Sequence, residues 1–168
     1  MTEGKASASA LRLRQKEASP RASALRLLKF RPRSEQELHE RLIRKGVAEP
    51  EVRKVVEDLR KKGFVDDVRF ARLFVSRQMH SKPIGRRMLL SRLKARGIAP
   101  EVAQGALEQG APGPDDLELA RQAAGPRMER MRDLPRETAD RRLFGFLSRR
   151  GFSSEVVYQV IRESHEQR

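Results

Sequence analysis

The sequence contains no cysteine and no tryptophan, and it has only one tyrosine and seven phenylalanines among its 168 residues. The absence of cysteine excludes disulfide bonds and thiolate zinc sites. The scarcity of aromatic residues is unfavourable for a single-strand binding protein that stacks bases on exposed rings. No apolar run reaches the length that spans a membrane, and the N-terminus lacks the apolar core of a secretory signal. We therefore expect a soluble, cytoplasmic protein.

Acidic residues are missing from one long stretch, residues 68–100, although the rest of the chain mixes both signs of charge. The formal net charge is +14, with 37 basic and 23 acidic residues. Uncompensated positive charge repels itself, so it is typical of a surface that meets an anionic partner. The alternative is that individual arginines only solvate helix faces, with their stems along apolar neighbours. The cations of this stretch are Arg69, Arg72, Arg77, Lys82, Arg86, Arg87, Arg92, Lys94 and Arg96.

Hydrophobic residues make up 38% of the chain and charged residues 36%. This composition provides a lean core and a heavily charged surface, which favours several thin cores over one large globule. We therefore expect an all-α protein with an elongated body of tandem helical modules.

Helix signals punctuate the first part of the chain. Pro20 follows a serine and stands at the first position of a helix that runs to about residue 29. Ser34 and Glu37 form a capping box for a second helix, which ends at Gly46. Pro50 opens a third helix. Its apolar stripe at helical spacing consists of Val52, Val55, Val56 and Leu59.

The same pattern recurs three times with a period of about fifty residues. Gly46, Gly97 and Gly151 each follow a pair of leucines placed four and eight residues earlier, and each precedes an apolar residue and a short helix. Three such coincidences in register indicate an internal repeat of three helices, which resembles the helix-turn-helix unit. The paired leucines are Leu38 and Leu42, Leu89 and Leu93, and Leu143 and Leu147.

These signals divide the chain into four parts. Residues 1–19 read as a disordered basic arm, because they are rich in alanine, serine and cations. Residues 20–67, 68–114 and 115–168 are the three predicted three-helix repeats. In the last repeat, we expect Gly125 and Pro126 to bend or interrupt the first helix.

The residue types that typically act in catalysis or bind metals do not occur at the spacing of a known motif. His39, His80 and His165 lie far apart, and none has a neighbouring aspartate, cysteine or second histidine at ligand spacing. The aspartate pairs at 66–67 and 115–116 stand at helix starts, where capping explains them better than metal binding does. No phosphate-binding glycine loop, dinucleotide fingerprint or nucleophile elbow is present. We expect no enzyme activity, no cofactor and no metal.

Binding residues are easier to assign. On the helix that contains Leu89 and Leu93, the spacing places Arg87, Ser91 and Lys94 on the opposite, outward face. The third helices lack the polar residues that read base edges, so sequence-specific DNA reading is the weaker idea. Beyond the nine cations of residues 68–100, the candidate partner-binding residues are Arg31, Arg33, Arg141, Arg142, Arg149 and Arg150.

The chain resembles the RecX family of bacterial regulatory proteins over residues 21–163. Several short motifs occur in order at family-like spacing, most specifically between residues 31 and 98, while the third repeat matches more loosely. The residues that carry the resemblance are Ala24–Leu28, Arg31–Leu38, Leu42–Val47, Leu59–Asp67, Arg69–Ala71 with Arg77, Gly85–Arg87, Leu93–Ile98 and Leu147–Phe152.

The resemblance implies a non-enzymatic regulator of the RecA recombinase, built from tandem three-helix repeats. Such a protein lies along the groove of the RecA–DNA filament and restrains filament extension, ATP hydrolysis, strand exchange and the co-protease activity that triggers the SOS response. We expect a monomer that also binds single- and double-stranded DNA more weakly and in a salt-sensitive manner. The alternative is an architectural protein that binds DNA without sequence preference and without RecA.

Overall fold

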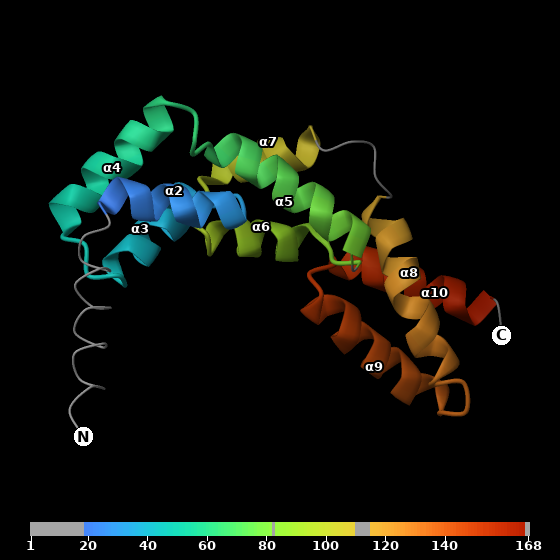
Figure 1. Ribbon diagram of the computed structural model, residues 1–168. Coiled ribbons are helices and arrows are strands. Elements are labelled where there is room, and N and C mark those ends of the chain that lie inside the picture. The colour runs from blue at the N-terminus through green and yellow to red at the C-terminus, as the bar shows by residue number, and fades with distance from the viewer. Residues whose placement is uncertain (1–18, 82, 110–114, 167–168) are drawn as a thin grey trace, which may run out of the picture. The chain divides into compact units, whose positions relative to one another are not determined.

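The computed structural model of the protein describes residues 19–81, 83–109 and 115–166, without the side chains of residues 79–81. Every element in these ranges is a helix (Figure 1). The helices form three groups of three, which we call modules 1, 2 and 3, so the predicted all-α class with tandem three-helix repeats is confirmed. Most of the predicted basic arm lies outside the described residues. The helices of module 1 are α2 (Pro20–Phe30), α3 (Glu35–Ile43) and α4 (Glu49–Lys61); those of module 2 are α5 (Asp67–Ser81), α6 (Arg86–Lys94) and α7 (Pro100–Glu108); those of module 3 are α8 (Asp116–Glu129), α9 (Arg136–Arg149) and α10 (Ser154–Glu166).

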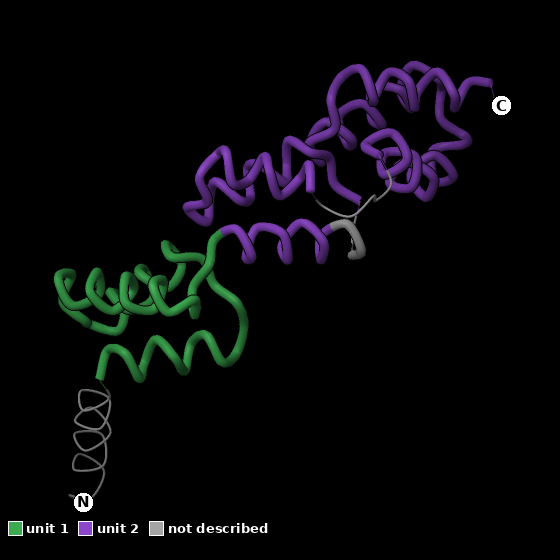
Figure 2. The backbone as a smooth tube through the Cα atoms, turned by 90° about the horizontal axis from the view of Figure 1, so that it is seen from above, with its two compact units in different colours: residues 1–67 green, residues 68–168 purple. Residues whose placement is uncertain are grey.

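The chain divides into two compact units, residues 1–67 and residues 68–168 (Figure 2). Each module has a separate hydrophobic core, as the lean composition predicts. Burial in module 1 centres on Leu38, Leu42 and Leu59, and in module 2 on Val75, Leu93 and Ile98. Module 3 has the largest of the three clusters, built around Leu143, Leu147 and Val157.

Side-chain caps fix several helix starts. The side-chain oxygens of Ser19, Ser34 and Asp115 each accept a hydrogen bond from the backbone N–H group three residues later, at 3.1, 3.1 and 2.7 Å. Each bond satisfies a donor that the first turn of a helix leaves unpaired. The predicted caps of α2, α3 and α8 are therefore in place.

The turn after the second helix is the same in all three modules. Gly46, Gly97 and Gly151 adopt positive φ angles of 82°, 75° and 85°. The residue after each glycine donates its N–H to the carbonyl of the buried leucine four residues before the glycine, at 3.2, 3.2 and 3.3 Å. This is the glycine-ended cap that reverses the chain after a helix. It explains why leucine and glycine recur at fixed spacing.

Helix α8 does not end at Pro126. The predicted interruption is absent, because the helix continues through Gly125 and Pro126 to Glu129. Both residues are exposed, whereas the neighbouring Ala123 and Ala124 are buried in the core of module 3. Packing of the alanine face therefore keeps the segment helical despite the missing N–H donor of proline.

Two aspartates join consecutive modules. Asp67, the first residue of α5, accepts a hydrogen bond from the backbone N–H of Glu35 at the start of α3, at 2.9 Å. Asp116, the first residue of α8, accepts from the N–H of Arg86 at the start of α6, at 3.2 and 3.3 Å. Burial raises the pKa of both carboxyl groups. The hydrogen bonds show that each carboxylate caps a helix of the preceding module and not the helix to which it belongs.

Candidate partner-binding surface

The outward face of α6 carries the cations that the sequence places there. Leu89 and Leu93 are buried, whereas Arg87, Ser91 and Lys94 are exposed. The side chains of Arg87 and Lys94 make no hydrogen bond or ion pair with another described residue. Because no carboxylate neutralises them, these charges are available to an anionic partner.

Other cations of residues 68–100 bind uncharged groups within module 2. The guanidinium of Arg72 donates to the side-chain amide oxygen of Gln109, and that of Arg92 donates to Gln78. Arg96 donates to the Arg92 carbonyl at 2.6 Å and lies 4.5 Å from the centre of the Phe74 ring. None of these partners carries a negative charge, and the contacts hold the three side chains within the module itself.

The remaining cations of the stretch differ in surroundings. The side chain of Arg86 lies 3.7 Å from the carboxylate of Glu108. Arg69 and Arg77 are both exposed on α5, and Arg69 interacts with a neighbouring residue. Lys82 lies outside the described residues.

Module 1 contributes two candidate arginines that are already engaged. Arg31 forms an ion pair with Glu37 at 2.8 Å. Arg33 donates to the carbonyl of Leu27 at 3.3 Å, and its Nη1 atom is buried without a hydrogen-bond partner among the described residues. Burial, together with the neighbouring Arg31 and Arg41, lowers the pKa of Arg33. We therefore rank these two residues below those of α6 as partner contacts.

Charge compensation distinguishes module 1 from the outward face of α6. Salt bridges in module 1 include several between residues four apart on one helix, which is typical of a solvated helix surface. The acidic side chains of module 1 that pair with a cation are Glu35, Glu37, Glu40, Glu49, Glu57 and Asp58.

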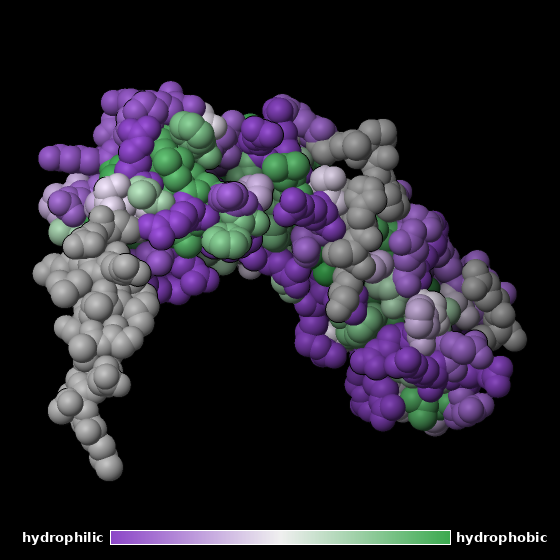
Figure 3. Space-filling model, in the orientation of Figure 1, coloured by the Kyte–Doolittle hydropathy of each residue, from purple (hydrophilic) through white to green (hydrophobic). Residues whose placement is uncertain are grey.

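Helix α9 presents a second group of free cations in module 3. Arg141, Arg142 and Arg149 are exposed, and their side chains form no ion pair with another described residue. Hydrophilic side chains lie over α9 on the face seen in Figure 3. Arg150 is different, because its guanidinium lies 4.6 Å from the centre of the Phe146 ring and donates to the Pro83 carbonyl at 2.9 Å. Arg150 therefore has a structural role in addition to its charge.

The structure brings α6 and α9 together. The backbone N–H of Gly85, the residue before α6, donates to the carbonyl of Arg150, the residue after α9, at 2.9 Å. The start of one cationic helix thus touches the end of the other. Sequence reasoning missed this contact, because the two residues are separated by a whole helical module. Gly85 has a φ angle of −75°, so the need for a left-handed backbone does not explain the glycine at this position.

The described histidines have carboxylate partners that their sequence neighbours do not reveal. Nε2 of His39 lies 3.0 Å from Glu49, and Nε2 of His165 lies 2.9 and 3.0 Å from the two oxygens of Asp140. His80 is among the residues whose side chains are not described. The side chain of His39 is half-buried.

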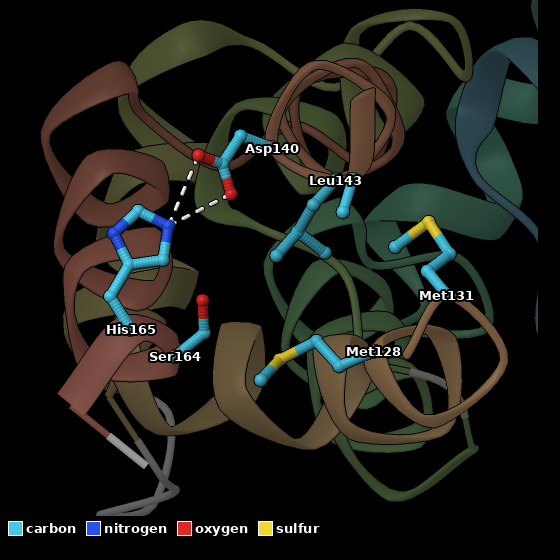
Figure 4. A pocket seen from close by; sticks show the side chains of 7 residues that line it. Met128, Met131, Asp140, Leu143, Ser164 and His165 are labelled. Carbon is cyan, nitrogen blue, oxygen red and sulfur yellow. Dashed lines mark hydrogen bonds and ion pairs between the residues drawn. The ribbon is translucent and has the colours of Figure 1, made fainter. Parts of the chain in front are cut away.

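A small pocket beside His165 has no catalytic arrangement (Figure 4). Ser164 donates its hydroxyl to the Ile161 carbonyl at 2.7 Å, so it is not activated by the histidine. Methionines 128 and 131 line the same pocket. The described residues also contain no group of three acidic residues or histidines placed to hold a metal ion. None of the helices in the described ranges has the length and apolar character needed to cross a lipid bilayer.

The three modules coincide with three domains of one protein family. Family models match the chain as "RecX, first three-helix domain" at residues 21–59, "RecX, second three-helix domain" at 66–107 and "RecX, third three-helix domain" at 114–161. The chain belongs to the RecX family. RecX proteins are non-enzymatic regulators of RecA.

Individual RecX proteins match most of the chain. Regulatory protein RecX of Chromohalobacter salexigens is 37% identical over 150 residues, which cover 89% of this chain and 95% of that protein. The RecX protein of Thermobifida fusca is 32% identical over 149 residues, covering 89% and 80% of the two chains. A crystal structure described as regulatory protein RecX superimposes with a TM-score of 0.78 at 25% identity, covering 97% of this chain and 80% of that one. RecX from Lactobacillus salivarius has the same fold, with a TM-score of 0.73 at 19% identity over 87% and 94% of the two chains.

Proposed function

We propose that this RecX protein binds along the groove of the RecA–DNA filament and restrains filament extension, ATP hydrolysis, strand exchange and co-protease activity. The observation that carries the proposal is the set of exposed, unpaired cations on α6 and α9, whereas several cations of module 1 are paired with carboxylates of the same module. A filament of RecA on DNA offers phosphates and acidic side chains, and several weak contacts made at once give high overall affinity.

The direct test is the rate of ATP hydrolysis by RecA on single-stranded DNA. A substoichiometric amount of the intact protein is expected to slow hydrolysis, because one bound molecule affects several RecA subunits. The double variant Arg87→Glu/Lys94→Glu is expected to inhibit at least about tenfold less well, because it places repulsive charges where attractive ones stood. No inhibition by the intact protein at any ratio would refute the proposal.

A matched control comes from module 1. The double variant Arg41→Glu/Lys45→Glu makes the same change in net charge on exposed residues of α3 and the turn after it, and neither residue forms an ion pair with another described residue. It is expected to inhibit RecA almost as well as the intact protein, since module 1 is not assigned to the cationic surface. Equal loss in both double variants would mean that inhibition depends on total charge and not on this surface.

The unpaired cations also support a second candidate, a general DNA-binding protein that acts without RecA. This alternative requires tight binding to DNA alone, with the logarithm of affinity falling steeply as the logarithm of salt concentration rises. Gel-shift titrations of DNA across a range of salt, with and without RecA, separate the two functions. Weak DNA binding at physiological salt together with inhibition of RecA supports the filament regulator.

A further inference from the structure

Two glycines allow the backbone at the start of α6 to lie directly on the turn after α9. A Cβ atom added to Gly85 would lie 2.4 Å from the carbonyl oxygen of Gly151, and one added to Gly151 would lie 2.4 Å from the backbone nitrogen of Met88. Gly46, which ends the equivalent helix of module 1, has nothing within 4 Å of such an atom. The glycine turn alone therefore does not produce the close contact, which in Gly151 is made with the start of α6; we call this contact between modules 2 and 3 the joint.

Further bonds from different elements hold the same joint. The Gly85 N–H donates to the Arg150 carbonyl, and the Arg150 guanidinium donates back across the joint to the carbonyl of Pro83, each at 2.9 Å. The Phe146 ring packs against that guanidinium. The guanidinium carbon of Arg127, on α8, lies 4.7 Å from the centre of the same ring. With the Asp116 cap on α6, the joint is fixed by backbone packing, an arginine clamp and a carboxylate.

The joint connects two helices that each present a short cationic face. On α6 this face extends from Arg87 to Lys94, and on α9 from Arg141 to Arg149. At about 1.5 Å per residue, each face is roughly 10–12 Å long. A nucleic-acid strand with about 3.4 Å of rise per nucleotide places only three or four phosphates along such a length. One face alone therefore offers few charge contacts, and two faces joined end to end offer about twice as many.

We propose that Gly85 and Gly151 are positioning residues that hold the cationic faces of α6 and α9 as one continuous surface for the sugar-phosphate backbone of a single nucleic-acid strand. Neither glycine contacts the strand. They act by fixing the angle between the two helices, so that a strand bound to one face reaches the other at high effective concentration. The inference rests on the proposed function for its anionic partner and adds which contact makes the two faces act together.

The test measures affinity as a function of strand length, without RecA and at low salt. Oligothymidylates of about 4 and about 12 nucleotides match one face and both faces. After correction for the number of binding positions, the intact protein is expected to bind the longer strand at least about tenfold more tightly. Gly85→Ala is expected to reduce this gain to about twofold or less while the affinity for the short strand stays the same. Gly105→Ala is the matched control, because a Cβ there meets open space.

An unchanged length-dependent gain in Gly85→Ala, or no such gain in the intact protein, overturns the inference. If Gly85→Ala does not fold, as judged by circular dichroism, Arg150→Met decides the question. Methionine is an unbranched side chain like arginine, but it cannot donate to the Pro83 carbonyl. If Arg150→Met loses the length-dependent gain in affinity, the inference is supported. If the gain is fully retained, the inference is overturned. Failure of the proposed function is distinguishable, because it shows as undisturbed RecA ATP hydrolysis and leaves the length dependence intact.

Discussion

The carboxylate of Asp116 shows how much a single side chain contributes to this molecule. It belongs to the first residue of α8, yet it caps α6, thirty residues earlier in the chain. Asp67 makes the equivalent bond to Glu35. The neighbouring Asp115 caps α8 itself, so the two members of that aspartate pair serve different helices. Side chains at these positions therefore cap helices that lie about thirty residues earlier in the chain.

Replacing Asp116 separates its hydrogen bond from its charge. Asp116→Ala removes the acceptor for the Arg86 N–H and is expected to cost about 1 kcal/mol of unfolding free energy, the typical value of a helix cap. Asp116→Asn retains an acceptor and is expected to cost less. Asp133→Asn, an exposed residue without a partner among the described residues, is the control and is expected to be neutral.

The pH dependence of Asp116→Asn has a defined sign. Burial raises the pKa of Asp116 in the folded protein, so protonation stabilises the fold. The contribution of this protonation to the free energy of unfolding is fully present below the pKa of about 3.9 in the unfolded chain. It is lost as the pH rises through the pKa of Asp116 in the folded protein. The wild type should therefore lose stability relative to Asp116→Asn over this window, as measured by urea unfolding at several pH values. A constant difference would contradict the assignment.

At the scale of elements, α8 contains the clearest conflict between local preference and tertiary packing. Gly125 and Pro126 both disfavour a helix, because glycine and proline have the lowest helix propensities. The helix persists because Leu119, Ala120 and Ala123 are buried against the rest of module 3. Local signals alone therefore predicted a break that the core does not permit.

Removing the proline should stabilise module 3. Pro126→Ala restores a backbone donor near the end of α8 and is expected to raise the unfolding free energy by about 1 kcal/mol, below the ~3 kcal/mol that proline costs in a helix centre. The measurement is the thermal midpoint by circular dichroism. Gly125→Ala is the comparison, because its Cβ would meet open space and the gain reflects helix preference alone. A lower midpoint in Pro126→Ala would mean that the proline fits a bend that module 3 requires.

Most of the helices and cores could be predicted because their signals are local. The leucine pairs and the glycines after them lie on one helix and one turn, so sequence spacing determines which residues are buried. The partners of Arg72, Arg92 and Arg150 could not be predicted, since Gln109, Gln78 and Pro83 lie on other segments. The same holds for the aspartate caps, because their acceptors and donors meet only after the modules fold.

At the scale of the whole molecule, the three cores are separate clusters of buried side chains. Helical repeats of this kind are stabilised mainly by contacts within a repeat and with its neighbours. A substitution in one core should therefore act mainly on that module. The division into two compact units gives the same expectation, with module 1 in a different unit from module 3.

Two equivalent leucines test this independence. Leu42→Ala and Leu147→Ala each remove a fully buried side chain beside the glycine turn, and each is expected to cost about 2–5 kcal/mol. Native-state hydrogen exchange should show that Leu42→Ala accelerates exchange in module 1 and Leu147→Ala accelerates it in module 3. Uniform acceleration across all three modules by either variant would show instead that the molecule unfolds as a single cooperative unit.

The aspartate link between modules has a direction. In both cases it runs from the first residue of the next helix group back to the second helix of the module before it, so α3 and α6 are each capped by an aspartate from later in the chain. In module 3, α9 begins at Arg136 after Pro135, and no side-chain hydrogen bond from the N-cap residue caps its start. A synthetic chain lengthened by copying residues 68–114 would thus need the aspartate of the following module directly behind every inserted copy. The order of the copied modules therefore has a fixed direction, because the aspartate must come from the module on the C-terminal side.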